Sequence, residues 1–163
     1  MATNFKMVPT APESASLSVL FGAGNTPGDR WDNKEQGKII KYVADSRYDL
    51  CAVGDEIEGF VQAVEQATQN GYSFGTMYDK QRRFVRADGL QATPGVGTIA
   101  VGDYVVCGSV TAKGTVLPDY PKVCKATSQA NAKATPYAWR VLAIMTGTGV
   151  VGDKLTIGRV GFL

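Results

Sequence analysis

A short motif that occurs three times decides how this sequence is interpreted. It reads Ala52-Val53-Gly54-Asp55-Glu56-Ile57, then Ala100-Val101-Gly102-Asp103-Tyr104-Val105, and finally Val150-Val151-Gly152-Asp153-Lys154-Leu155. The three Val-Gly-Asp units begin at residues 53, 101 and 151, so they are spaced 48 and 50 residues apart. A near-constant period of this kind predicts a repeated structural element.

Each unit has the chemistry of a corner at the head of a β-strand. Glycine permits a positive φ at the corner, and the aspartate can accept hydrogen bonds from backbone amides just ahead of it. Apolar residues then alternate, as in Val105 with Cys107 and Leu155 with Ile157. This turn role accounts for the Gly-Asp pairs. The alternative, a catalytic metal site, would need the three carboxylates to converge on one metal ion. The predicted structural turns are at Gly54, Asp55, Gly102, Asp103, Gly152 and Asp153.

Short apolar runs between turn signals continue outward from the motif. They predict strands over residues 39–44, 83–86, 139–145 and 154–160, and a short helix or a loop over 128–134. Residues 56–69 are open to two interpretations. Their apolar side chains have helical spacing, but Gly59 and the Asn70-Gly71 hairpin signal favour strand, turn, strand. The pattern predicts an all-β fold, a small β-barrel or sandwich with an extended N-terminal arm and at most one short helix.

The first 38 residues differ from the rest because proline, glycine, serine, threonine and asparagine dominate them. We therefore predict two parts, an extended N-terminal arm over 1–38 and a β-barrel or sandwich domain over 39–163. Apolar residues within the arm need burial on this domain or on a partner. The candidate partner-binding residues are Phe5, Met7, Val8, Leu17, Val19, Leu20 and Phe21.

Composition excludes several functions. Histidine is absent, which removes Ser-His, Cys-His and His-metal chemistry, and no phosphate-binding loop occurs. We expect no catalytic residues, no cofactor and no bound metal, hence no enzyme. The sequence has no apolar run of membrane-spanning length and no secretion signal at its start, so neither membrane association nor secretion is expected. Cys51, Cys107 and Cys124 are expected to be buried free thiols.

Charge is nearly balanced, with 17 basic and 15 acidic residues and a net charge of +2. That balance argues against a dedicated duplex-DNA binder. The most basic stretch is 80–86, and Tyr78 and Phe84 interleave with it. It could bind single-stranded nucleic acid by stacking and charge, be a solvated strand face, or contact an acidic protein partner.

Several of these features together resemble the capsid decoration, or cement, proteins of tailed bacteriophages. They are the polar arm, the histidine-free β domain, the strand led by Gly102-Asp103 within 99–106, the hairpin over 70–75 and the ending over 139–160. The resemblance covers residues 39–163. It implies a structural virion protein that binds the outer surface of an expanded icosahedral capsid and bridges major capsid subunits.

The same resemblance implies self-association, with a trimer favoured over a dimer, and location on the capsid surface after synthesis in the host cytoplasm. No specific nucleic acid is expected as a partner. The arm would then pair as an added strand with the capsid or with a neighbouring copy. The alternatives are a tail-tube, head-completion or fibre-like virion protein, and a small β-barrel module that binds single-stranded nucleic acid.

Overall fold

The computed structural model describes residues 16–22, 30–44, 47–65, 73–80, 82–88, 98–135 and 137–162. The described residues form strands joined by turns, with one short α-helix, so the predicted all-β class is confirmed. The strands are β1 (Ser16–Phe21), β2 (Ile39–Ala44), β3 (Arg47–Leu50), β4 (Gly59–Glu65), β5 (Ser73–Tyr78), β6 (Arg83–Ala87), β7 (Tyr104–Cys107), β8 (Lys122–Lys125), β9 (Trp139–Ile144) and β10 (Lys154–Arg159). The helix is α2 (Gln129–Ala134), and two 3₁₀ turns are η1 (Asn33–Glu35) and η2 (Val160–Phe162).

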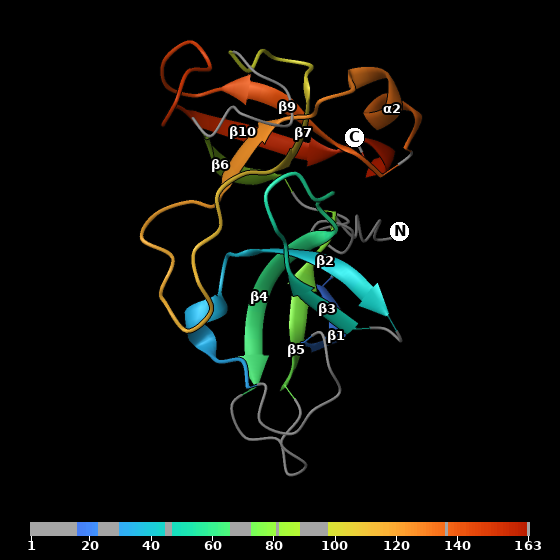
Figure 1. Cartoon of the computed structure of the whole chain (residues 1–163), viewed down its shortest axis with the longest axis vertical. Helices are drawn as coiled ribbons and strands as arrows, with labels where there is room; N and C mark the ends of the chain where they lie inside the picture. The colour runs from blue at the N-terminus through green and yellow to red at the C-terminus, as the bar shows by residue number, and fades with distance from the viewer. Residues whose placement is uncertain are drawn as a thin grey trace, which may run out of the picture.

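The strands form two closed barrels that lie one above the other in Figure 1. Barrel 1 has the strand order β1-β3-β2-β4-β5, and barrel 2 has the order β10-β6-β8-β7-β9. Closure leaves neither sheet with an open edge, which removes the unpaired backbone that invites uncontrolled strand addition.

The two barrels have the same topology. In each, the first strand runs parallel to the third and antiparallel to the fifth, and all other neighbours are antiparallel. The registers also agree. Val61 pairs with Met77 in barrel 1, as Val141 pairs with Ile157 in barrel 2. A bulge follows each of these pairs at the equivalent place, so the chain folds the same five-stranded unit twice.

The structural repeat is therefore not the one that the motif spacing predicts. The repeated unit is a whole barrel, and equivalent strands are separated by more than the 48 or 50 residues between motifs. The motif at 101–103 directly precedes β7, and the motif at 151–153 directly precedes β10. The motif at 53–55 lies in the β3–β4 connection and is followed by three residues outside any strand, 56–58. The motif marks a turn design that is used in several places.

The described part of the predicted arm belongs to barrel 1. Strand β1 pairs with β3 on one edge and with β5 on the other, and Trp31 is buried in the core of this barrel. The structure thus differs from the division predicted at residue 38, because the short run 16–21 finds its burial and its hydrogen bonds inside its own chain. Residues 1–15 lie outside the described residues.

Local sequence explains the other elements. Residues 59–65 form strand β4, as the interruption by Gly59 favours, and the Asn70-Gly71 signal lies outside the described residues. Strand β5 alternates buried and half-buried positions with the period of two expected of a strand. Ser128 caps the start of helix α2, because its side chain accepts a hydrogen bond from the backbone N–H of Asn131 and so satisfies a free helix donor.

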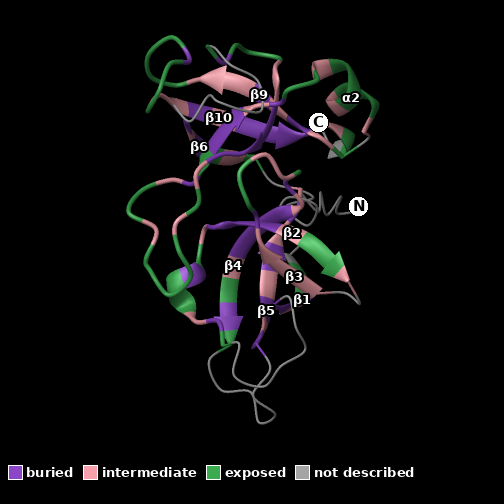
Figure 2. Cartoon of the chain, viewed as in Figure 1, coloured by how far each residue is buried: buried purple, intermediate pink, exposed green. Residues whose placement is uncertain are grey.

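The two barrels share one hydrophobic core. Its buried residues come from both, including Ile39 and Phe60 of barrel 1 and Trp139 and Leu155 of barrel 2. Phe60 and Trp139 meet edge to face with ring centroids 5.1 Å apart. Figure 2 shows buried stretches on β4 and β10. Because apolar side chains from both barrels are buried against each other, the two units should behave as one folding unit.

A long connection also ties the barrels together. Residues 108–121, which we call the strap, join β7 to β8 and run down the side of the molecule toward η1 (Figure 1). At one end Gly114 N–H donates to Glu35 Oε1 at 2.6 Å, and Lys38 Nζ donates to the Ala112 carbonyl at 2.8 Å. At the other end Arg86 Nε donates to Asp119 Oδ2 at 2.7 Å. The strap is thereby fastened to both barrels.

Candidate interaction surfaces

The three Val-Gly-Asp turns share one geometry, as the sequence predicts. Gly54, Gly102 and Gly152 have φ values of 90°, 94° and 84°, which favour glycine. Each aspartate carboxylate accepts a hydrogen bond from the backbone N–H three residues earlier, at 2.7 Å for Ala52, 2.8 Å for Ala100 and 3.0 Å for Val150. The carboxylates are therefore occupied in holding turns.

Each turn also docks on a strand of barrel 2. The glycine N–H donates to a strand carbonyl, and the N–H of that same strand residue donates to the aspartate carbonyl. The strand residues are Cys107, Val141 and Ala87 for the first, second and third turn. The first turn belongs to barrel 1, so its two bonds to Cys107 join the barrels. Sequence reasoning identified the turns but not their docking sites, which lie far away in the chain.

Barrel 1 contains a fourth turn of the same design without the motif. Gly37 has a φ of 83°, its N–H donates to the Val61 carbonyl, and Val61 N–H donates to the Lys38 carbonyl. Lys38 takes the place of the aspartate. Its ammonium lies 2.5 Å from Glu35 Oε2, and both side chains are only 1% exposed. A buried ion pair with further hydrogen bonds to the strap thus replaces the Asp turn.

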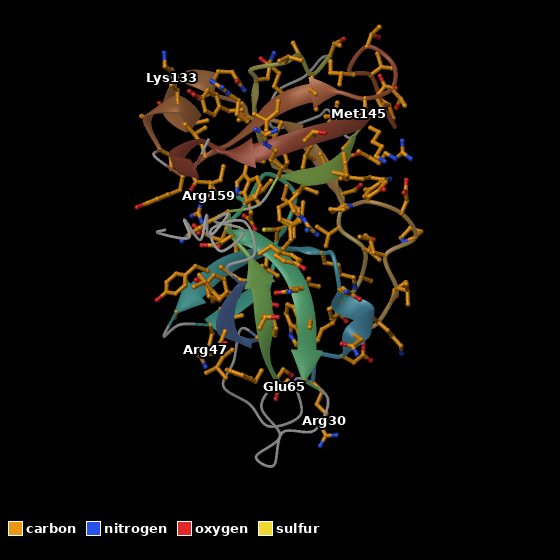
Figure 3. All side chains as sticks on the ribbon, turned by 180° about the vertical axis from the view of Figure 1, so that it is seen from behind. Arg30, Arg47, Glu65, Lys133, Met145 and Arg159 are labelled. Atoms are coloured by element: carbon orange, nitrogen blue, oxygen red, sulfur yellow. The ribbon has the colours of Figure 1, made fainter. Side chains whose placement is uncertain are left out.

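Exposed apolar side chains gather on two neighbouring loops at the far end of barrel 2. We call residues 98–103 and 145–153 the apical loops; Ile99 N–H donates to the Gly149 carbonyl at 2.9 Å and holds them together. They expose Val101, Met145, Val150 and Val151, with Val101 and Val151 61% and 68% exposed. Figure 3 places Met145 at this end, away from barrel 1, and Figure 2 shows the loops as mostly exposed.

A groove lies where barrel 1, the start of β6 and the strap meet. We call it the junction groove; its cavity volume is about 500 Å³. Its charged lining residues are Lys34, Arg82, Arg83 and Asp119. The Arg83 guanidinium lies 4.5 Å from the Tyr78 ring centroid and 5.4 Å from that of Phe60. Burial lowers the pKa of Arg83.

The predicted arm residues are not brought together on an open surface. Val19 and Phe21 are buried inside barrel 1, where Phe21 stacks on Trp31 with ring centroids 4.6 Å apart. Leu20 is half-buried, and Leu17 is 43% exposed. Strand β1 pairs with β5 over its whole length and with β3 at Leu20 and Phe21, so these last two residues have no backbone edge left for a partner strand while barrel 1 is closed. Phe5, Met7 and Val8 lie outside the described residues.

The three cysteines are buried free thiols, as predicted. A hydrogen bond with the Cys107 thiol, together with burial, raises the pKa of Cys51. Burial raises the pKa of Cys124 to about 11. Since the thiolate is the reactive form, these two groups are poor nucleophiles near neutral pH.

Within the described residues, no group of three or more Cys, Asp or Glu side chains is arranged to hold a metal ion. None of the helices in the described ranges is long and apolar enough to cross a membrane. Comparison with protein-family models, with curated proteins and with solved structures found no match for this chain.

Proposed function

We propose that this chain is a structural virion protein that binds the outer surface of an expanded tailed-phage capsid and stabilises it by bridging major capsid subunits. The observation that carries the proposal is the four exposed apolar side chains on the two neighbouring apical loops, presented by a body of two barrels with a common core. Loops on a rigid scaffold are where binding residues concentrate, and clustered exposed apolar side chains mark interaction surfaces. The sequence resemblance to decoration proteins points to the same role.

The physical basis of such a function is differential binding. A protein that binds the expanded lattice and not the immature one shifts the equilibrium toward the expanded state by its binding free energy. Burial of four exposed apolar side chains per copy gives a modest free energy, but many copies act on one shell. Self-association, with a trimer favoured, would add to this avidity, and analytical ultracentrifugation measures it.

The first experiment is co-sedimentation of the purified chain with expanded heads and with unexpanded proheads of the phage that encodes it. We expect saturation on expanded heads at a simple ratio to the major capsid protein and much weaker binding to proheads. Failure to bind either particle would refute the proposal. A handful of copies per particle would instead indicate a tail or vertex component.

A matched pair of variants tests the apical loops. Val101→Asp and Val151→Asp place a charge in the cluster and should lower affinity for expanded heads at least ten-fold. Val53→Asp makes the same change in the same type of turn, but at the barrel junction, and should bind as the unaltered chain does. Equal binding by all three variants would exclude the apical loops as the capsid-binding surface.

A further inference from the structure

Among the residues that the structure describes, Arg83 is a half-buried cation without a counter-ion. Its side chain is half-buried between Tyr78 and Phe60, and none of the carboxylates in the described ranges forms an ion pair with it. Burial of a charge without a partner has a free-energy cost, which the lowered pKa of Arg83 reflects. A carboxylate placed at the groove would remove that cost.

The rest of the junction groove has matching charge. Arg82 adds an exposed cation to its lining, Lys34 lies there 3.7 Å from Asp32, and Asp119 is already paired with Arg86. The volume of about 500 Å³ lies in the range of roughly 300–1,000 Å³ that is typical of ligand sites. The strap contributes Val116, Leu117, Asp119, Tyr120 and Pro121 to the lining of the groove.

We propose that the junction groove binds carboxylate side chains of an extended acidic segment of a partner protein, with Arg83 as the principal contact. Arginine presents two parallel N–H donors that match a carboxylate, and such charge-assisted bonds are the strong ones. That the partner is a capsid subunit rests on the proposed function; the acidic chemistry rests on the groove alone.

Single-stranded nucleic acid fits the groove less well. Such binding needs aromatic faces on which bases stack. Here Arg83 lies over Tyr78, and Lys154 lies 4.5 Å from the ring centroids of both Phe84 and Tyr120. The rings are thus engaged with cations of the chain itself. The groove therefore has positive charge but few free aromatic faces, which favours the binding of carboxylates over the stacking of bases.

The test measures binding of fluorescent peptides to the full chain by anisotropy. The probe is a short peptide of alternating Asp and Ser; the controls are the same peptide with Asn for Asp and a thymidine oligonucleotide. We expect the Asp peptide to bind, with salt-sensitive affinity, and the Asn peptide to bind at least ten-fold more weakly. Equal binding of the two peptides would overturn the proposal, as would tighter, competing binding of the oligonucleotide.

Matched variants locate the site. Arg83→Gln should weaken Asp-peptide binding about ten-fold, and Arg82→Gln should weaken it less. Lys133→Gln removes one exposed cation on α2, on the opposite side of the molecule from the strap (Figure 3), and should change nothing. If Arg83→Gln and Lys133→Gln bind alike, the assignment of Arg83 is wrong.

Two further variants keep the test decisive if Arg83→Gln fails to fold. Arg83→Lys retains the charge but not the paired donors and should bind with intermediate affinity. Asp119→Asn removes the carboxylate at the groove and should bind the Asp peptide several-fold more tightly. No change in either variant would overturn the proposal.

The expanded-head assay separates this proposal from the proposed function. If heads bind the unaltered chain and Arg83→Gln equally and the Asp peptide is not bound, the groove proposal fails while the capsid role stands. If the Asp peptide binds through Arg83 but no particle binds, the capsid role fails and the groove remains a site for an acidic partner of another kind.

Discussion

Barrel 1 and barrel 2 follow the same backbone path but fill it with different side chains. In barrel 1 the ring of Phe21 lies against Gly75, where an added Cβ would come within 2.8 Å of the ring. The strand pairings make Ala87 and Leu155 the equivalent residues in barrel 2. The large and small residues have exchanged places across the core. Because interiors are close-packed, total volume has to match, while the side that supplies it is free to change.

The equivalent turns show a second difference. Barrel 2 holds the turn before β7 with Asp103, whose carboxylate also pairs with Lys125 at 2.9 Å and stays partly exposed. Barrel 1 holds the turn before β2 with the buried pair of Glu35 and Lys38, which also anchors the strap. The Asp103 turn is held by a side chain within the turn, and the Glu35–Lys38 turn is also held by tertiary contacts. The two turns have the same backbone geometry, but only the turn in barrel 1 needs contacts with a distant segment, the strap, to hold it.

Truncation should produce the largest effect. Deletion of residues 1–21 removes β1, opens barrel 1 and exposes its core, so we expect loss of cooperative thermal unfolding for the whole chain. Deletion of residues 1–15 is the matched control, because it retains β1. Circular dichroism melting measures both. A cooperative transition in the longer deletion would show that barrel 2 folds without barrel 1.

Glu35→Gln should come next. It leaves the Lys38 ammonium buried without its counter-charge, and loss of one partner of a buried pair costs about 3–5 kcal/mol of stability. Asp103→Asn at the equivalent turn should cost about 1 kcal/mol, since its carboxylate is partly solvated. Urea unfolding measures the two free energies. Equal losses of unfolding free energy in the two variants would show that the turn at Glu35 and Lys38 is no more dependent on tertiary contacts than the turn at Asp103.

The buried thiols should make stability fall at alkaline pH. Burial raises the pKa of Cys124 to about 11, and the pKa of Cys51 is raised as well. The folded state therefore keeps protons that the unfolded state releases above its thiol pKa of about 8.5. This stabilisation is complete below that pH and is lost as the pH rises toward 11.

Unfolding free energies from pH 8 upward test this dependence. Replacement of Cys51 and Cys124 by alanine removes both groups and should flatten the alkaline decline, although lysine and tyrosine titration remains. An unchanged slope in the double variant would show that the thiols do not contribute. Cys51 follows β3 and lies in the core that the two barrels share, whereas Cys124 lies in β8 and packs with Val106 and Ala126.

The smallest expected effect is the coupling between Phe60 and Trp139. Each replaced by alanine should destabilise the chain by about 3–5 kcal/mol because of the cavity left in the shared core. The double variant should be less destabilised than the sum by about 0.5–1.5 kcal/mol, the usual strength of an aromatic pair. A double-mutant cycle in urea gives this value. Strict additivity would mean that the rings do not couple the barrels.

Sequence reasoning succeeded where the signal is local. The three Asp turns and the strand over 59–65 follow from residues within a few positions of each other. Residues 128–134 were open to a short helix or a loop, and the structure has the helix over Gln129–Ala134. Sequence reasoning placed the boundary differently at the N-terminal segment, because the short apolar run 17–21 is visible in the sequence but its pairing with β3 and β5 involves distant segments. Glu35 and Lys38 gave no signal, since a three-residue spacing of opposite charges is common on exposed helices.

The sequence predicts only one part of the junction groove. The basic stretch 80–86 is evident, but the strap that walls the groove comes from residues 108–121, and Asp119 meets Arg86 only in the folded chain. Arg86 and Asp119 are 33 residues apart, and a contact between such distant residues produces no periodic pattern in the sequence. The same is true of the docking of each turn on Cys107, Val141 or Ala87.

By itself the sequence determined the all-β class, the turn chemistry, the absence of histidine chemistry and the burial of the three thiols. These follow from composition and from side chains that act on their own backbone. Only the tertiary structure decided that there are two barrels of one design, that β1 closes the first, and that the strap and a common core join them. Strand pairing and core volume are shared between distant segments, so no local pattern specifies them.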